Sequence, residues 1–344
     1  MYMYTNGHSR IVSTGIYLPE QCIRSREVME LAQSQRRFGL HPDWLEKVTG
    51  VRERRACAEG ILPSDMAVAA ARQAMDNAGL AAGKLDAIVY AGVVRDHMLE
   101  PGTAHVVQHK LDADNAVVFD VNNACLGFMS AIHLMDALIA TGQVRYGLIV
   151  TGEQGYQYAL KACHRLQQIN DRQEFSRLAA GLTLGDAGAA VIMGPKIDAE
   201  TGFMGFIAHS EGKYSELCFC GDALRETPLY TDMAGITREA ARMVGLIFHD
   251  LMDQRLRWQP RQVSKLITHQ AGKSNFRILS DITKIPVEGI PETVTTLGNI
   301  ITASVPVILH RLLMADQVNT GDRLLLSGSG GGISAAQAAL VWDK

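Results

Sequence analysis

The segment DVNNACLGFM, residues 120–129, contains the candidate nucleophile of this chain. The run AVVFDV, residues 116–121, overlaps the start of this segment, is apolar and β-branched, and predicts a buried strand. Apolar residues then recur at helical spacing from Cys125 to about Ala140. Cys125 is therefore expected near the N-terminus of a helix, where unpaired backbone N–H groups and the helix dipole lower the pKa of a thiol. A buried, unreactive cysteine is the alternative.

Two further polar residues, His269 and Asn299, are linked to Cys125 by an internal repeat. The run LDAIVYAGV, residues 85–93, resembles SKLITHQAG, residues 264–272. Cys125 followed by a helix and GLIVTG corresponds, at about the same offset, to Asn299 followed by a helix and RLLLSG. A duplicated β/α unit has this pattern. A pseudo-two-fold axis between the units would bring the three side chains together, although singly a histidine is more often packed and such an asparagine more often a helix cap.

Predicted strands and helices alternate along the chain. Strands are expected at residues 11–18 and 85–91, and helices at residues 25–35 and 64–78, the second of which ends at Gly79. This alternation is typical of a mainly parallel sheet covered by helices, so we expect an α/β fold.

The two units are expected to form closely packed halves, residues 1–195 and residues 196–344. Glycines punctuate the chain between residues 184 and 205, but no low-complexity linker separates the halves. With 344 residues, of which 47% are hydrophobic, the chain can bury a large core.

Charge and cysteine content argue against several classes of protein. The formal net charge of -3 gives no basic field for nucleic acid. Six cysteines without a CxxC pair fit neither a disulfide framework nor a usual zinc site, so Cys218 and Cys220 are interpreted as structural and no metal is expected. The N-terminus lacks the apolar core of a signal peptide, and no run approaches the roughly 18 apolar residues of a membrane helix. We therefore expect a soluble cytoplasmic protein without nucleic-acid or membrane partners.

Basic residues gather around Trp44 in the sequence. They are Arg36, Arg37, Lys47, Arg52, Arg54 and Arg55. Such a cluster is either a solvated surface or the mouth of an anion-binding site, and the pattern alone does not separate the two interpretations.

Four motifs in a fixed order give the chain a family resemblance. DVNNACLGF, LITHQAG, LGNIITASVP and SGSGGG resemble the active-site segments of the thiolase superfamily, and most closely those of the beta-ketoacyl-ACP synthase III type. STGIYLPEQ, WLEKVTGVRERR and LTLGDAGAAVIMG extend the resemblance over nearly the whole chain. It implies a five-layered αβαβα fold built from two duplicated β/α halves, a homodimer, and a catalytic set of Cys125, His269 and Asn299. It implies no cofactor, with thioesters of coenzyme A or phosphopantetheine as substrates.

The chemistry of these residues agrees with the resemblance. Cys125 would attack an acyl thioester and hold the acyl group covalently. The backbone N–H groups of Cys125 and Gly331 could form an oxyanion hole, and glycine permits the close approach. His269 and Asn299 could donate hydrogen bonds to the carbonyl of a second thioester and stabilise the enolate that becomes the carbon nucleophile.

The chain departs from the synthase III pattern at the expected mouth of the site. HQAGKSN replaces the usual HQANxR, so that Gly272 and Ser274 stand where asparagine and arginine are expected, and Val48 replaces an arginine. Trp44 keeps a flat surface for stacking an adenine, and Lys273 keeps a positive charge. Trp44 and Lys273 are thus predicted to contact substrate, and whether coenzyme A or an acyl carrier protein delivers the acyl group stays open.

Glu100 marks a second departure, because it precedes Pro101 where initiation synthases usually have a large apolar residue. This run resembles condensing enzymes that join two acyl chains in head-to-head olefin, α-pyrone and cyclohexanedione biosynthesis, in which the glutamate reaches across the dimer interface. A carboxylate in an apolar tunnel has a raised pKa and could deprotonate the α-carbon of an acyl thioester. A surface position, or pairing with Arg95, is the alternative.

We therefore predict a ketosynthase that joins two acyl thioesters by Claisen condensation and yields a β-keto product in fatty-acid-derived or polyketide secondary metabolism. The first alternative is an initiation synthase acting on acyl-CoA and malonyl-ACP, against which Glu100 and Ser274 count. An acyltransferase of the same fold is a second alternative, but Asn299 favours enolate chemistry. A non-catalytic partner subunit would have little reason to carry Cys125, His269 and Asn299 together.

Overall fold

The computed structural model describes residues 2–220 and 228–343, and two five-stranded sheets form its centre. The first sheet has the order β2-β8-β7-β5-β6 and the second β1-β9-β14-β13-β12. The strands of the first sheet are β2 (Ser9–Tyr17), β5 (Ala87–Tyr90), β6 (Val117–Asp120), β7 (Gly147–Gln154) and β8 (Asp186–Pro195). Those of the second are β1 (Met3–Asn6), β9 (Gly202–Tyr214), β12 (Val263–Thr268), β13 (Arg323–Gly330) and β14 (Gly332–Val341).

The two sheets share one connectivity, which confirms the predicted duplication. β5 pairs with β7 as β12 pairs with β13, in parallel. The pairs β7–β8 and β8–β2 are antiparallel, and so are the corresponding pairs β13–β14 and β14–β9. The expectation of mainly parallel pairing is therefore wrong, because the strand that closes each unit, β8 or β14, runs against both of its neighbours.

The edges of the sheets differ between the halves. β6 extends the first sheet beyond β5, whereas β1 extends the second sheet beyond β9 at the other edge. The chain thus begins with β1 in the second sheet and then continues with β2 in the first sheet. β8 ends at Pro195 and β9 begins at Gly202. The boundary between the two halves at residues 195 and 196 stays a prediction.

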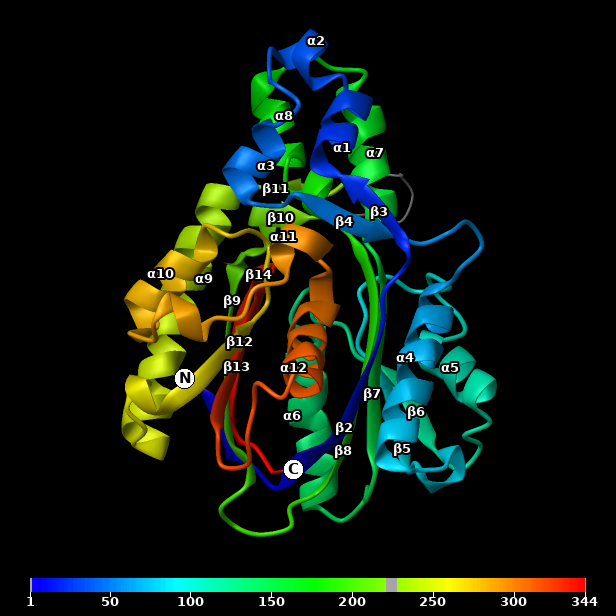
Figure 1. Ribbon diagram of the computed structural model, residues 1–344, viewed down its shortest axis with the longest axis vertical. Coiled ribbons are helices and arrows are strands. Elements are labelled where there is room, and N and C mark those ends of the chain that lie inside the picture. Colours follow the sequence, from blue (N-terminus) through cyan, green and yellow to red (C-terminus); the bar gives the residue numbers. More distant parts are fainter. Residues whose placement is uncertain (1, 221–227, 344) are drawn as a thin grey trace.

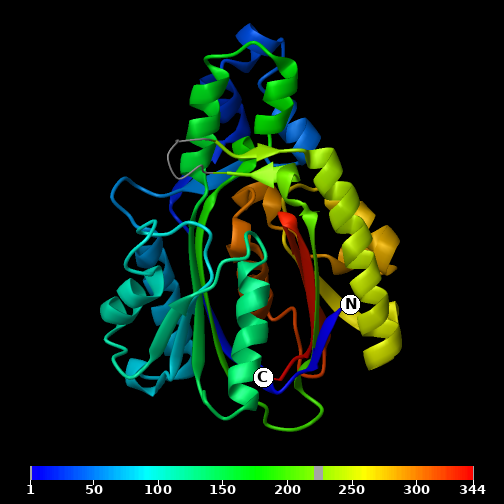
Figure 2. The same cartoon turned by 180° about the vertical axis from the view of Figure 1, so that it is seen from behind.

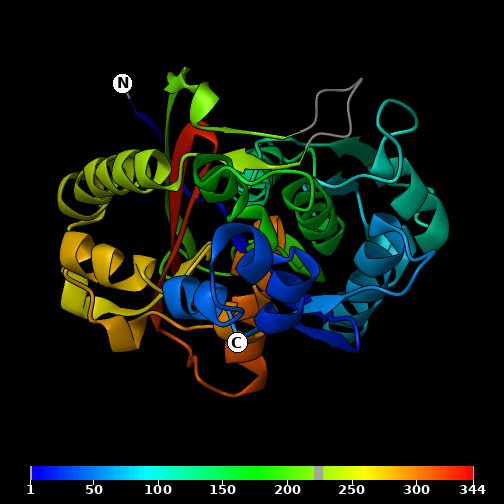
Figure 3. The ribbon, with the colours of Figure 1, turned by 90° about the horizontal axis from the view of Figure 1, so that it is seen from above.

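Helices complete a five-layered αβαβα arrangement, as predicted (Figure 1). α4 (Pro63–Ala78) and α5 (Thr103–Leu111) cover the outer face of the first sheet, and α9 (Met233–His249) and α10 (Asn275–Thr283) cover that of the second. α6 (Gly127–Ala140) and α12 (Ser304–Met314) lie between the sheets. The view from behind shows α6 in this central layer, and the view from above separates the two outer helix layers (Figures 2 and 3).

The apolar stripe of α6 explains its central position. Phe128, Ile132, Met135 and Ile139 are buried between the sheets, in agreement with the helical spacing seen in the sequence. Gly127 starts the helix where a Cβ atom would lie 2.4 Å from the carbonyl oxygen of Ala91, so the close approach of α6 to the end of β5 requires glycine.

A smaller group of helices lies at one end of the layers, at the top of Figure 1. Its elements are α1 (Ser25–Leu31), α2 (Ser34–Phe38), α3 (Trp44–Thr49), α7 (Tyr156–Leu166) and α8 (Arg172–Leu178), with the strand pairs β3 (Gln21–Arg24) and β4 (Glu53–Ala56), and β10 (Cys218–Phe219) and β11 (Tyr230–Thr231). The single helix expected at residues 25–35 is broken at Gln33, which has a φ of 53°. The helix expected at residues 64–78 is confirmed, and Gly79 ends it with a φ of 60°.

Among residues 2–220 and 228–343, no helix has the length and apolarity needed to cross a lipid bilayer. In the same residues, no cluster of three or more His, Cys, Asp or Glu side chains is placed to hold a metal ion. All six cysteines belong to this part of the chain and none forms a disulfide, so the sulfur of Cys125 is present as a thiol.

Candidate active site

A cavity of about 660 Å³ opens between the two halves, and Cys125, His269 and Asn299 all line it. Cys125 lies between β6 and α6, His269 follows β12, and Asn299 follows the short helix α11 (Val294–Leu297). Much of the remaining wall is apolar or small, contributed by α9 and α10. The duplicated fold thus brings together the three side chains that the repeat had linked, and their catalytic roles stay predictions.

The turn before α6 fixes the backbone of Cys125. Ala124 has a φ of 45°, a left-handed conformation that turns the chain sharply out of β6. The N–H groups of Leu126 and Gly127 donate to the carbonyl oxygens of Asn123 and Ala124, at 3.0 Å each. Cys125 therefore precedes the first turn of α6, as the sequence predicted.

The pKa of the Cys125 thiol differs from the prediction. Burial raises it to about 12, and the nearby thiol of Cys218 also acts to raise it. Desolvation, which disfavours the thiolate, is the largest influence on this group, so the expected lowering of the pKa is wrong. A nucleophile of this kind needs a base to take its proton as it reacts.

His269 has the tautomer of such a base. Its Nδ1 lies 3.0 Å from the carbonyl oxygen of Ile301 and 3.2 Å from Oγ of Ser304. A carbonyl oxygen only accepts, so Nδ1 carries the proton and Nε2 is the acceptor in the neutral ring. Burial lowers the pKa of His269 to about 4, which keeps the ring neutral near pH 7. In this form Nε2 of His269 can accept a proton, and it can make the predicted donation to a thioester carbonyl only after it has been protonated.

This assignment predicts how acyl loading responds to pH. The lowered pKa of His269 keeps its imidazole in the basic form down to about pH 5. The loading rate should therefore not fall between about pH 8 and about pH 5, whereas a histidine with the ordinary pKa of about 6.5 would lose activity around pH 6.5. Stopped-flow release of the free carrier thiol measures this rate, with circular dichroism at each pH as the control for folding. A loss of loading centred near pH 6.5 would contradict the assignment.

Asn299 is buried and its amide is oriented by the backbone. Oδ1 accepts a hydrogen bond from the N–H of Ile301 at 3.0 Å, which leaves the Nδ2 hydrogens for an acceptor in the cavity. Its own backbone N–H donates to the carbonyl oxygen of Thr183 at 2.9 Å, and its carbonyl accepts from Gly185 at 3.0 Å. Asn299 thus has the arrangement of a hydrogen-bond donor to a developing enolate oxygen.

The glycine-rich turn between β13 and β14 packs against the loop of Cys125. A Cβ atom on Gly330 would lie 3.4 Å from the backbone nitrogen of Cys125, and one on Gly331 would lie 3.4 Å from Cβ of Cys218. Both glycines line the cavity, and the role of Gly331 in an oxyanion hole stays a prediction. Cys218, interpreted as structural from the sequence, also lies on the cavity wall, a position that no local sequence signal indicated.

The two residues predicted to contact substrate at the mouth have different positions. Trp44 lines the cavity and packs edge-on against Phe175, with ring centroids 5.4 Å apart. Lys273 does not line it, and its ammonium group lies 3.1 Å from the carboxylate of Glu292. Arg238, which the sequence analysis did not single out, contributes a cationic side chain to the wall instead.

The basic cluster around Trp44 divides into two environments. Arg54 is fully buried and donates to the carbonyl oxygen of Leu182 at 2.8 Å, so neither a solvated surface nor a cavity mouth describes it. Lys47 and Arg52, by contrast, are exposed. The sequence could not show this division, because it depends on which arginine faces the core between the two halves.

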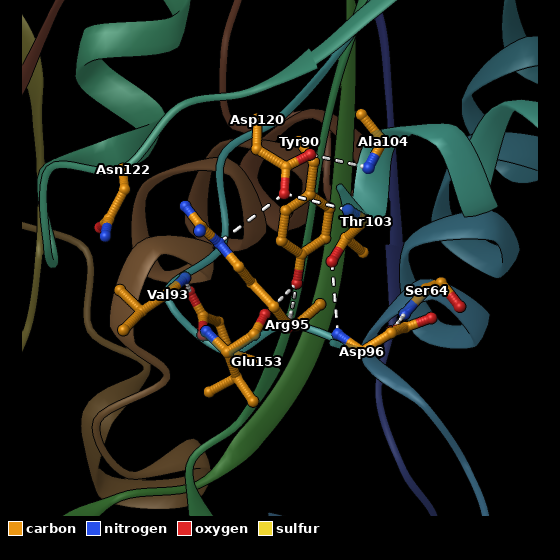
Figure 4. Close-up of polar contacts among 12 residues, drawn as sticks. Ser64, Tyr90, Val93, Arg95, Asp96, Thr103, Ala104, Asp120, Asn122 and Glu153 are labelled. Carbon is orange, nitrogen blue, oxygen red and sulfur yellow. Dashed lines mark hydrogen bonds and ion pairs between the residues drawn. The ribbon is translucent and has the colours of Figure 1, made fainter. Parts of the chain in front are cut away.

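Glu100 lies outside the cavity of its own chain. It is exposed, on the loop between β5 and α5, next to Leu99, which is 88% exposed. Arg95, its alternative partner, lies 3.7 Å from Asp120 instead, and the carboxylate of Asp120 accepts from the N–H groups at the start of α5 (Figure 4). The structure therefore does not bring Glu100 and Cys125 of one chain together.

Comparisons with known proteins match nearly the whole chain. Residues 119–212 match the model of 3-oxoacyl-[acyl-carrier-protein (ACP)] synthase III, and residues 254–342 match the model of its C-terminal part. The chain is 29% identical to a beta-ketoacyl-[acyl-carrier-protein] synthase III of Laribacter hongkongensis, over 97% of this chain and 99% of that protein. It is also 29% identical to an acyl-CoA:acyl-CoA alkyltransferase of Xanthomonas campestris pv. campestris, over 93% and 94% of the two chains.

Solved structures give the same two relationships. OleA of Xanthomonas campestris superimposes with a TM-score of 0.91 at 27% identity, covering 98% of both chains. A 3-oxoacyl-(acyl carrier protein) synthase III, FabH, of Xanthomonas oryzae pv. oryzae superimposes with a TM-score of 0.91 at 28% identity, covering 99% of this chain and all of that one. Fold, length and order of elements are therefore shared with both.

Proposed function

Because the chain belongs to the 3-oxoacyl-[acyl-carrier-protein] synthase III family of the thiolase superfamily, we propose that this ketosynthase joins two acyl thioesters by Claisen condensation. The observation that carries the proposal is the convergence of Cys125, His269 and Asn299 on one cavity with a largely apolar wall. The product is a β-keto compound of fatty-acid-derived or polyketide metabolism. Similarity to an acyl-CoA:acyl-CoA alkyltransferase supports a second acyl chain as the nucleophile.

The first half-reaction loads the enzyme. Nε2 of His269 accepts the thiol proton as Sγ of Cys125 attacks the thioester carbonyl, and the backbone N–H groups of Cys125 and Gly331 stabilise the oxyanion. The bond between the carbonyl carbon and the carrier sulfur then breaks. His269 returns the proton to the leaving thiolate, which leaves an acyl-cysteine and a neutral imidazole ready for the second substrate.

The second half-reaction forms the carbon–carbon bond. Glu100 of a partner subunit removes a proton from the α-carbon of the second acyl thioester, and Nδ2 of Asn299 donates to the enolate oxygen. The carbanion attacks the acyl carbon, and the bond to Sγ of Cys125 breaks. The Cys125 thiolate takes up a proton and Glu100 gives up the one it removed, so both groups return to their starting states as the β-keto thioester leaves. The chemistry needs no cofactor, and either coenzyme A or an acyl carrier protein serves as carrier at the mouth formed by Trp44.

A homodimer follows from the same proposal. β6 is an edge strand of the first sheet, and Val117 on it is 69% exposed. Met98 and Leu99, just before Glu100, are 70% and 88% exposed. An unpaired strand edge beside exposed apolar side chains is typical of an interface, and two copies meeting here would place each Glu100 loop against the other chain. We expect the dimer to act in the cytoplasm, where thiols stay reduced.

An initiation synthase that condenses an acyl-CoA with malonyl-ACP is the second candidate, supported by 29% identity to a beta-ketoacyl-[acyl-carrier-protein] synthase III. A panel of acyl-CoA and acyl-carrier substrates, with and without malonyl-ACP, separates the two candidates by the masses of the enzyme adducts and the released products. A product formed from two acyl chains without malonyl-ACP supports our proposal. A requirement for malonyl-ACP supports the second candidate.

The Asn299→Ala variant tests the condensation step in the same assay. It should load acyl groups at the wild-type rate but slow formation of the β-keto product by about 10²- to 10³-fold, the usual cost of removing one donor to an oxyanion. Intact-protein mass spectrometry follows loading, and product mass follows condensation. A defect confined to loading, or transfer of the acyl group to oxygen or nitrogen acceptors with no carbon–carbon product, would overturn the proposed reaction.

A further inference from the structure

The backbone of one residue, Ile301, holds both polar side chains that converge on Cys125. Its N–H donates to Oδ1 of Asn299 at 3.0 Å, and its carbonyl oxygen accepts from Nδ1 of His269 at 3.0 Å. Ile301 has a φ of 52°, in the left-handed region, where a β-branched side chain is strained. Such a conformation persists only when neighbouring contacts hold it, so the residues around Ile301 determine how both side chains are oriented.

Thr302, the next residue along the chain, supplies contacts of this kind. It lies in the short 3-10 helix Ile301–Ala303 and is 1% exposed. Its hydroxyl lies 2.6 Å from Oγ1 of Thr151 and donates a hydrogen bond to Oε1 of Glu153. Thr151 and Glu153 belong to β7, in the half that carries Cys125. The hydroxyl of Thr302 therefore ties the backbone after Asn299 to the opposite half of the molecule. It does so in addition to a backbone hydrogen bond between Thr302 and Glu153 and to the backbone hydrogen bonds of Asn299 itself.

Glu153 connects this contact to the loop that carries Glu100. The side chain of Glu153 is fully buried, and its two oxygens accept from the N–H groups of Val93 and Val94 at 2.9 and 3.2 Å. Figure 4 shows Glu153 beside Val93 at the base of this loop, below Arg95 and Asp120. Burial raises the pKa of Glu153 to about 7 despite these donors. A single carboxyl group thus joins the segment after Asn299 to the loop before α5.

We propose that Thr302 and Glu153 are positioning residues for condensation, which orient the amide of Asn299 through Ile301 and anchor the Glu100 loop through Val93 and Val94. The inference rests on the proposed function. It predicts unequal effects on the two half-reactions, because His269 keeps a second contact with Oγ of Ser304 at 3.2 Å. Among the described residues, the hydrogen bond that orients Oδ1 of Asn299 comes from Ile301 alone.

The Thr302→Val variant tests the proposal, because valine keeps the shape of threonine and removes the hydroxyl. Acyl loading of Cys125 should stay within about twofold of wild type, while kcat for condensation falls by about 10- to 100-fold at an unchanged KM, the cost of a misplaced catalytic group. Thr302→Ser, which keeps the hydroxyl, should restore kcat. Glu153→Gln should reproduce the loss, because a carboxamide nitrogen cannot accept the hydrogen bonds that a carboxylate oxygen accepts.

Thr14→Val is the matched control. Thr14 is also a buried threonine whose hydroxyl bridges the halves, with Oγ1 2.9 Å from Nδ1 of His310 on α12. Removal of the Thr14 hydroxyl should lower the melting temperature about as much as Thr302→Val does. It should leave the ratio of the condensation rate to the loading rate at the wild-type value. The proposal is overturned if Thr302→Val matches Thr14→Val in that ratio, or if it slows loading and condensation equally. Failure of the proposed function would be seen separately, as wild-type enzyme that forms no carbon–carbon product.

Discussion

Replacing Cys125 with serine is expected to abolish covalent acyl loading, with a fall of about 10⁴-fold or more in its rate. The reason is the proton that must leave the nucleophile. Burial already raises the pKa of the thiol to about 12, and it lowers the pKa of His269, the proposed base, to about 4. An alcohol is a still weaker acid than this thiol, so the same imidazole cannot activate it. Intact-protein mass spectrometry after incubation with acyl-CoA measures the loss directly.

The position of the acyl group decides the assignment of the nucleophile. Cys22→Ser, which changes an exposed cysteine on β3, should load as the wild type does and serves as the control. Peptide mapping should find the adduct on Cys125 alone in the wild-type protein. An adduct of equal yield in Cys125→Ser, placed by mapping on Cys218 of the same cavity, would show that the second thiol is the nucleophile.

The fold could be predicted from the sequence to the extent that local patterns repeat. The apolar stripe of α6 follows from residue spacing, and the correspondence of β5 with β12 follows from two runs of similar letters. A second match at about the same offset, GLIVTG with RLLLSG, relates Cys125 to Asn299, and in the structure both residues line one cavity. The pairing of β1 with β9 could not be predicted, because it joins residues about 200 positions apart that share no motif.

The electrostatics of the site could not be predicted in the same way. A helix N-terminus is a local feature and suggested a low thiol pKa, whereas desolvation depends on every element around Cys125 and has the opposite, larger effect. Lys273 was expected at the substrate, but Glu292, 19 positions along the chain, pairs with it. Glu153 had no distinguishing motif, since its importance comes from Val93, Val94 and Thr302, which only the folded chain brings to it.

Replacing Glu100 with alanine is expected to leave acyl loading intact and to slow condensation by about 10²- to 10⁴-fold, the range for loss of a general base. The exposed position of Glu100, away from the cavity of its own chain, makes this effect possible only if the carboxylate acts in a partner subunit. Loading is measured by intact mass and condensation by product mass. Wild-type turnover in Glu100→Ala would reduce Glu100 to an ordinary surface residue.

Mixing two inactive variants tests whether Glu100 acts across the interface. Glu100→Ala lacks the base and Cys125→Ala lacks the nucleophile, so each homodimer should be inactive in condensation. In a mixed dimer, the Cys125 of the first chain meets the Glu100 of the second, which restores one complete site. After dissociation and reassociation of equal amounts, about a quarter of wild-type activity should return, since half of the dimers are mixed and each has one intact site. If Glu100 served the cavity of its own chain, every site in the mixture would lack one group, and no activity would return.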